Sequence, residues 1–312
     1  MEIAEKLNIV GSFLGDHRKV GNEYLYHCPF CNHHKKKLSL NFEKSKFKCW
    51  VCDAHGNIRR LVRKKATLDL FQKWKQIDGE VDLNTNLDDL FTDTAEAKEE
   101  ILSLPDGFTT LTSKTNPLSY KKYLNYLKKR GLTQQDILYW KIGFCSDGEY
   151  KDRIVIPSFN SDGNVNFFVG RTVVGDKFAK FKQPSISKDI IFNELYLDFD
   201  NDITLVEGIF DAIKAGHNAI PMLGSTLREE SKLFQKIVGY DTAVYMALDP
   251  DAKKKESEII RKLINYGIEV YKVDILPYKD AGEMTKEEFQ KRKACARLMT
   301  YDTLLQQELE VA

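Results

Sequence analysis

Short apolar runs rich in β-branched residues recur in the C-terminal half of the chain. They predict buried strands at 203–206, 243–248 and 270–275. Helical spacing of the apolar positions predicts helices between these strands at 210–215 and 256–265, and one or two helices that cover most of 286–309. Because strands that alternate with helices are typical of an open α/β sheet, this pattern predicts the fold class of that half.

The N-terminal half has a different pattern. Alternation of apolar and polar residues predicts two strand pairs, at 37–42 with 46–50 and at 152–157 with 165–171. Helical spacing predicts three helices, at 3–14, 120–130 and 133–140. Gly131 is placed to end the second of these helices, and Thr133 to cap the third. We therefore expect mixed α+β structure ahead of the α/β sheet.

Two of the predicted buried strands end in acidic residues. Glu207 follows the first, and Asp249 and Asp251 follow the second. In open α/β sheets ligands bind beyond the carboxyl ends of the strands, so we expect these three side chains to converge. Carboxylates suit Mg²⁺, which keeps further positions open for phosphate oxygens. The sequence predicts a magnesium site here, with Asp211 nearby in the next helix.

Four of the six cysteines form two Cys-x-x-Cys pairs, Cys28 with Cys31 and Cys49 with Cys52, separated by 17 residues. This spacing is typical of a closed, tetrahedral structural zinc site. A redox pair and an iron–sulfur site are the alternatives. The predicted hairpin lies between the two pairs, so we interpret the module as a zinc ribbon stabilised largely by its metal.

Charge is unevenly distributed although the net charge of the 312 residues is only +1. Residues 1–65 hold 14 Lys/Arg against 6 Asp/Glu, and residues 66–106 hold 3 against 11. A basic end suggests a polyanionic partner for the first segment. The acidic stretch at 66–118 predicts a connector with some helix around 68–76 and 94–102, and a small ordered helical insert is the alternative. No run is long enough to span a membrane, and residues 1–6 lack the basic-then-apolar pattern of a signal peptide, so we expect a cytosolic protein.

Basic and aromatic residues are candidates for binding nucleic acid. In the zinc ribbon, Trp50 and Lys48 are placed to stack on bases and to hold phosphates, whereas Phe42 and Phe47 are equally consistent with a small core. A second basic block precedes the acidic strand ends and contains Arg153, Arg171, Lys180 and Lys182. Arg binds phosphate with two donors and Lys as a point charge, so this block predicts contacts to the phosphate groups of nucleotides or of a nucleic acid.

Three motifs carry a resemblance to a known family. Val206-Glu207-Gly208, Leu223-Gly224-Ser225 and Asp249-Pro250-Asp251 resemble the Toprim domain in order. The ribbon resembles that of DnaG-like and T4-type phage primases, and the basic block resembles the subdomain that precedes Toprim in them. The chain departs from the pattern in two places. Lys253 to Lys255 stand where these primases usually have Gly, and Asp280 keeps only the first of a further acid pair.

The resemblance implies an α/β protein with an N-terminal zinc ribbon, a mixed α+β basic subdomain and a Rossmann-like Toprim sheet with short C-terminal helices. The expected boundaries are 1–65 for the ribbon, 66–118 for the connector, 119–200 for the basic subdomain, 201–284 for Toprim and 285–312 for a helical tail.

The function that the resemblance implies is a DNA primase, a DNA-directed RNA polymerase that makes short RNA primers for lagging-strand replication. Its partners would be single-stranded DNA, ribonucleoside triphosphates and a replicative helicase acting in trans, in the bacterial cytoplasm or that of the host if the chain is phage-encoded. Its cofactors would be one structural Zn²⁺ and, for catalysis, two further ions of Mg²⁺ or Mn²⁺. Glu207, Asp249 and Asp251 would hold the catalytic ions, with Asp211 and Asp280 as outer acids, and Glu207 as either ligand or proton acceptor. The alternatives are a non-catalytic RecR-like recombination protein and a Toprim nuclease.

Overall fold

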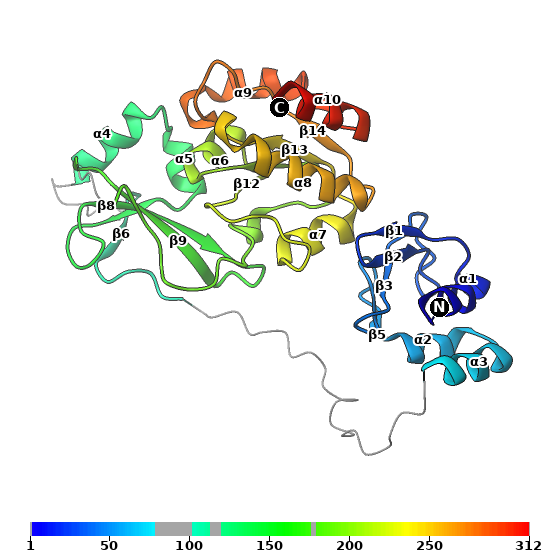
Figure 1. Cartoon of the computed structure of the whole chain (residues 1–312). Helices are drawn as coiled ribbons and strands as arrows, with labels where there is room; N and C mark the ends of the chain where they lie inside the picture. The colour runs from blue at the N-terminus through cyan, green and yellow to red at the C-terminus, as the bar shows by residue number, and fades with distance from the viewer. Residues whose placement is uncertain (1, 79–101, 113–119, 176–178, 312) are drawn as a thin grey trace. The chain divides into compact units, whose positions relative to one another are not determined.

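The computed structural model describes residues 2–78, 102–112, 120–175 and 179–311 of the chain (Figure 1). They belong to two compact units, one built mainly from the first 98 residues and the other mainly from the remainder. No helix in these described ranges has the length and apolar character needed to cross a bilayer.

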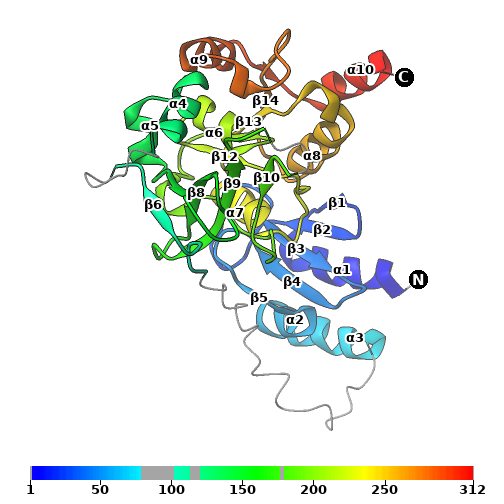
Figure 2. The ribbon, with the colours of Figure 1, turned by 90° about the vertical axis from the view of Figure 1, so that its left-hand side faces the viewer.

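The first unit is a five-stranded antiparallel sheet with three helices. The strands follow the order β1-β2-β3-β4-β5 and comprise β1 (Arg18–Val20), β2 (Glu23–Tyr26), β3 (Leu38–Asn41), β4 (Lys46–Cys49) and β5 (His55–Asn57). Helix α1 (Glu2–Leu14) precedes them, and α2 (Ile58–Lys65) and α3 (Leu68–Asp78) follow and pack side by side (Figure 2). The predicted N-terminal helix and the predicted β3–β4 hairpin are confirmed.

The hydrophobic core of the first unit is formed by side chains of its sheet and its helices. Leu38 and Leu40 of β3 pack with Val10 of α1 and Leu61 of α2, and all four are fully buried. Phe42 and Phe47 are buried in the same cluster, at 7% and 6% exposure, so these two rings fill the core.

Helix α3 also belongs to this core, because Trp74 is 2% exposed among the same side chains. The predicted connector at 66–118 therefore begins too early. It also ends too late, since β6 (Phe108–Thr110) pairs with a strand of the second unit. Periodicity within an acidic segment could not reveal that one tryptophan anchors it. The helix expected near 94–102 falls almost entirely outside the described residues.

The second unit begins with an antiparallel sheet in the order β10-β9-β8-β7-β6. Its remaining strands are β7 (Gly143–Cys145), β8 (Arg153–Phe159), β9 (Val165–Thr172) and β10 (Phe181–Lys182). The helices α4 (Lys121–Lys129) and α5 (Gln134–Tyr139) lie between β6 and β7 in the chain, and the turn η3 (Glu194–Tyr196) follows β10. Thr133 caps α5 as predicted, and Asp136 completes a capping box with it.

A mostly parallel sheet follows, in the order β12-β11-β13-β14-β15. Its parallel strands are β11 (Ile203–Val206), β12 (Ala219–Pro221), β13 (Val244–Ala247) and β14 (Val270–Lys272). The helices α6 (Ile209–Ala215), α7 (Lys232–Tyr240) and α8 (Lys253–Asn265) alternate with them. Buried side chains of β11 are apolar at every position except Thr204, as a strand covered on both faces requires.

The C-terminal segment is largely helical but contains a short strand that was not predicted. After the turn η5 (Ala281–Glu283) and α9 (Lys286–Ala294), the chain forms β15 (Arg297–Leu298), which pairs antiparallel with β14, before α10 (Tyr301–Val311). The prediction that 286–309 is largely helical is therefore confirmed, but β15 extends the sheet past the expected boundary at 284. A strand of two residues leaves no periodic signal in a sequence.

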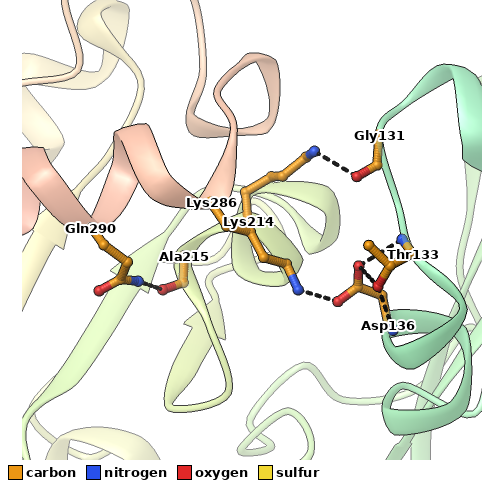
Figure 3. A network of polar contacts seen from close by, with 7 residues as sticks. All are labelled: Gly131, Thr133, Asp136, Lys214, Ala215, Lys286 and Gln290. Carbon is orange, nitrogen blue, oxygen red and sulfur yellow. Dashed lines mark hydrogen bonds and ion pairs between the residues drawn. The ribbon is translucent and has the colours of Figure 1, made fainter.

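A polar network ties the helices of the two sheets together (Figure 3). The Asp136 carboxylate is 2% exposed and forms an ion pair with Lys286 of α9, while it accepts hydrogen bonds from the backbone and hydroxyl of Thr133. Burial acts to raise the pKa of Asp136, but the hydrogen bonds from Lys286 and Thr133 outweigh it and hold the pKa below its ordinary value.

Helix α6 is held by two further contacts of this network. Lys214 Nζ donates to the Gly131 carbonyl at 3.1 Å, and Gln290 Nε2 donates to the Ala215 carbonyl at 2.7 Å (Figure 3). The Ala215 carbonyl is at the C-terminal end of α6, where free carbonyl groups need donors. The helix that starts two positions after Glu207 is thus fixed against α9 and against the turn between α4 and α5.

Candidate active site and zinc centre

The four predicted zinc ligands meet in the first unit. The Sγ atoms of Cys28, Cys31, Cys49 and Cys52 all lie within 4.8 Å of one another. Cys28 to Cys52 and Cys31 to Cys49 are each 3.8 Å apart. A tetrahedron of thiolates at the usual Zn–S distance of ~2.3 Å has edges of about 3.8 Å, so the cluster has the size that zinc requires. Burial raises the pKa of the Cys28 and Cys49 thiols, so the metal must stabilise these thiolates.

Aromatic and basic side chains surround this cluster. Lys48 Nζ lies 5.5 Å from the centre of the Trp50 ring, within the range of a cation–π contact. The ring of Phe30 was not predicted as a contact. It is 39% exposed, is stacked on Phe47 with centroids 6.2 Å apart, and lies 4.7 Å from Lys65 Nζ. The sequence signal for an exposed ring here was the position of Phe30 between Cys28 and Cys31.

In the second unit, Glu207 and Asp211 lie at the start of α6. Glu207 directly follows β11, and the Gly208 backbone N–H donates to Asp211 Oδ2 at 2.8 Å. A Cβ on Gly208 would lie 2.9 Å from that same oxygen, so this turn requires glycine. The strand end therefore fixes the Asp211 carboxylate.

Asp280 approaches Asp211 from the turn η5. The Gly282 backbone N–H donates to Asp211 Oδ1 at 2.9 Å, and Asp280 Oδ1 accepts from the Glu283 backbone N–H at 3.0 Å. Burial, followed by the charges of Asp280 and Asp249, raises the pKa of Asp211 to about 7, although the two backbone hydrogen bonds act to lower it. Asp211 is 7% exposed. These acids share one electrostatic environment although 69 residues separate Asp211 from Asp280 in the chain.

Asp249 lies at the end of the neighbouring strand, two positions after Ala247, the last residue of β13. Burial, followed by the charges of Glu207, Asp280 and Asp251, raises its pKa to about 6. Its Oδ1 is buried and has no hydrogen-bond partner within the described part of the chain. The structure thus brings the five predicted acids to one edge of the parallel sheet, where their charges act on each other.

The donor set fits a divalent cation of the hard type, because it consists of carboxylates and includes a buried oxygen with no donor. The carboxylate oxygens of these acids are nevertheless less closely clustered than the four Sγ atoms of the cysteines. Within the described ranges, the cysteine cluster alone brings three or more ligand atoms within 4.8 Å of one another. Glu207 is paired with Lys255, whose Nζ lies 3.1 Å from Oε1 and 3.0 Å from Oε2. No local pattern predicted a contact between Lys255 and Glu207.

The predicted basic residues divide into an inward and an outward group. Arg153 is 8% exposed, and its Nη1 donates to the Ala179 carbonyl at 2.9 Å. It therefore holds the segment before β10 against β8. Its position at the start of a strand gave no indication that it would be buried.

The outward group comprises Arg171, Lys180 and Lys182. Arg171 Nε donates to the Tyr126 hydroxyl at 2.9 Å, and its guanidinium lies 4.6 Å from the centre of the Phe181 ring. Lys180 is exposed, and Lys182 forms an ion pair with Glu149 at 2.7 Å. Arg171, Lys180 and Lys182 thus lie on β9 and β10 or beside them.

Arg130 joins this group although the sequence marked it only as the end of a helix. Its Nε donates to the same Tyr126 hydroxyl at 2.9 Å, and its guanidinium lies 4.3 Å from the centre of the Phe210 ring. Phe210 is the second residue of α6, three positions after Glu207. A basic cluster therefore contacts the helix that starts at the acidic edge.

Known proteins resemble both units. Residues 2–92 match the family model described as the CHC2 zinc finger, the zinc ribbon of DnaG. A DNA primase from Listeria innocua is 24% identical over 287 residues, which are 73% of this chain and 45% of that protein. A DNA primase from Aquifex aeolicus is 25% identical over 329 residues, which are 91% of this chain and 64% of that protein.

The chain is DnaG-like. A solved structure of the Aquifex aeolicus primase, with its zinc-binding and RNA polymerase domains, covers 95% of the chain at a TM-score of 0.51 and 20% identity, and the match spans 84% of that structure. This likeness extends to the order of the parts, since the DnaG-like chain places its zinc ribbon before a mixed α/β core. The chain spans about half the length of the curated relatives it matches.

Proposed function

We propose that this DnaG-like chain is a primase that makes short RNA primers on single-stranded DNA by Mg²⁺-dependent nucleotidyl transfer. The observation that carries the proposal is the acidic edge of the parallel sheet. There burial and the neighbouring carboxylates raise the pKa of Asp249 and of Asp211. A basic cluster contacts the same helix through Phe210. Mutually repelling carboxylates beside cationic side chains suit a site that takes cations and phosphates together.

The residues present would divide the work as follows. Glu207, Asp249 and Asp251 would hold Mg²⁺, with Asp211 and Asp280 beside them. The chemistry that bound Mg²⁺ supplies is activation of the primer 3′-hydroxyl and charge neutralisation at the leaving pyrophosphate. Arg130, Arg171, Lys180 and Lys182 would orient the triphosphate and the template, which is where positioning contributes most to phosphoryl transfer. Arg153 would support β10 from within.

The zinc ribbon would select the start site on the template. Exposed Phe30 and half-buried Trp50 offer rings for stacking on bases, and Lys48 and Lys65 lie beside those rings. A replicative helicase acting in trans would deliver the single strand, in the bacterial cytoplasm or in that of a phage host.

Template-directed synthesis tests the proposal. The wild type is incubated with labelled ribonucleoside triphosphates and single-stranded templates that cover all start triplets, with and without Mg²⁺. We expect short RNA oligomers only with Mg²⁺, and none from Glu207→Gln or Asp249→Asn. Asp162→Asn changes an exposed acid in the turn between β8 and β9 and is the matched control. Strand cleavage without oligomers would favour a nuclease, and DNA binding without either product would favour a RecR-like role.

A further inference from the structure

Lys255 lies in the first turn of α8 and contacts the acidic edge directly. Its Nζ reaches both carboxylate oxygens of Glu207, at 3.1 and 3.0 Å. The two side chains are 24% and 19% exposed. A two-point contact between an ammonium and a carboxylate in partly buried surroundings is a strong kind of hydrogen bond.

The backbone around Lys255 is fixed by its neighbours. The chain leaves β13 through Asp249 and turns in η4 (Pro250–Ala252) into α8. The next residue, Glu256, is buried and accepts from Lys272 Nζ at 2.6 Å. The first turn of α8 is therefore anchored to β14, and Lys255 is held with its side chain toward Glu207.

The ammonium of Lys255 acts on more than one acid. Besides its contact with Glu207, its charge lowers the pKa of Asp249, against the effects of burial and the other carboxylates. The Lys255 ammonium therefore lies where the negative charges of these acids favour a cation. The carboxylate oxygens that it contacts are those that Glu207 would offer to Mg²⁺.

A recess beside the lysine gives its side chain room to move. The recess has a volume of about 370 Å³ and is lined by Thr226, Asp251, Ala252, Lys254, Lys255 and Glu258. A long, flexible lysine can turn from Glu207 into this space without a change of backbone.

We propose that Lys255 is the internal counter-ion of the acidic edge, which holds Glu207 in place and is displaced when a divalent cation binds. The inference rests on the proposed function, since it takes Glu207 as a cation ligand. Lys255 is then a positioning residue whose charge competes with the cation. The competition sets how much Mg²⁺ the site needs, and the cation must break the lysine contact before it gains that ligand.

Direct measurement of Mn²⁺ binding tests this. Free Mn²⁺ is followed by electron paramagnetic resonance in metal-free buffer without chelator, template or nucleotide, on protein checked to hold one zinc per chain. We expect Lys255→Met to bind Mn²⁺ about tenfold more tightly than the wild type. That factor corresponds to ~1.4 kcal/mol, close to the lower end for hydrogen bonds to charged groups. Lys254→Met removes an equal charge from the same recess and is the matched control, expected to differ from wild type by about twofold at most because exposed charges are screened.

Each other result overturns the inference. Equal affinities of Lys255→Met and Lys254→Met would show that the Glu207 contact does not compete. Weaker binding by Lys255→Met would show that the lysine assists the cation. If Lys255→Met combined with Glu207→Gln still binds tightly, the cation lies elsewhere.

A second readout guards against misfolding. The melting temperature of Lys255→Met should rise more with Mn²⁺ than that of the wild type, because stabilisation by a ligand grows with its affinity. Lys255→Gln, which keeps much of the side-chain length, should behave in the same way. Because neither measurement includes template or nucleotide, a wild type that binds Mn²⁺ through Glu207 but makes no primer counts against the proposed function alone.

Discussion

The guanidinium of Arg130 lies over the ring of Phe210, 4.3 Å from its centre, and this contact joins the basic cluster to the helix that begins beside Glu207. Arg130 also shares the Tyr126 hydroxyl with Arg171. One side chain thus links β9, α4 and α6, although the three are far apart in the chain. The orientation of the basic surface relative to the acidic edge depends on this link.

Replacement of Arg130 should weaken both template binding and stability. Arg130→Lys keeps the charge but loses the planar stack on Phe210, so we expect a loss of about 1 kcal/mol in the free energy of unfolding of the second unit. Arg130→Met should in addition raise the dissociation constant for a fluorescent single-stranded oligonucleotide, measured by anisotropy. Lys129→Met removes a neighbouring exposed charge and is the control. If Lys129→Met weakens binding as much as Arg130→Met does, the stack on Phe210 has no special role.

Folding of the first unit should require zinc, whereas folding of the second unit should not. We expect one zinc per chain by atomic absorption, and we expect Cys49→Ser to lose it, because Cys49 is fully buried and its thiolate needs the metal. Structural zinc contributes ~10–16 kcal/mol in small modules, so residues 2–78 should then be cut rapidly in limited proteolysis while the second unit stays resistant. Cys295→Ser changes an exposed cysteine away from the cluster and should keep the metal. Retention of zinc by Cys49→Ser would contradict the four-thiolate site.

The sequence predicted those parts that depend on local pattern and failed where distant segments meet. Cysteine spacing identified the zinc ligands, and strand-end acids identified Glu207 and Asp249, because each signal lies within a few residues. Burial of Arg153 and the contact of Lys255 depend on segments that the fold alone brings near. Nothing local distinguishes a lysine that turns toward an acid from one that faces solvent.

Contacts between distant segments also decide where the first unit and the last sheet end, and local pattern does not predict them. Trp74 extends the first unit by a helix, and β15 adds a strand to the last sheet. Both follow from packing against residues more than 20 positions away. The parallel strands were predictable because a strand that is buried on both faces has apolar residues at nearly every position.

Asp136 should make stability depend on pH in the acid range. Its pKa is lowered in the folded chain, so its ionised form contributes stability that is fully present above its ordinary pKa of about 4 and is lost as the pH falls through the lower folded value. We expect Asp136→Asn to lower the free energy of unfolding at pH 7 by about 2 kcal/mol, within the range for hydrogen bonds to charged groups.

The measurement is denaturant unfolding followed by the fluorescence of Trp140, which is buried in the second unit. The difference between wild type and Asp136→Asn should shrink as the pH falls below about 4. Asp69→Asn breaks an exposed ion pair with Lys73 and should have little effect at any pH. A difference that stays constant from pH 7 to pH 3 would mean that the ion pair with Lys286 is not what the substitution removes.

Gly282 should be essential to the acidic edge because there is no room there for a side chain. A Cβ at this position would lie 2.7 Å from Asp211 Oδ1 and 3.1 Å from Asp280 Oδ1. Both oxygens belong to carboxylates held by backbone N–H groups, so Gly282→Ala must displace them and break the hydrogen bond to Asp211 at 2.9 Å. We expect a loss of ~1–3 kcal/mol in stability and much weaker Mn²⁺ binding. Gly175→Ala, which would meet no atom within 4 Å, is the matched control and should bind Mn²⁺ as the wild type does. Normal Mn²⁺ affinity in Gly282→Ala would show that Asp211 and Asp280 need no fixed position, and their part in the site would have to be withdrawn.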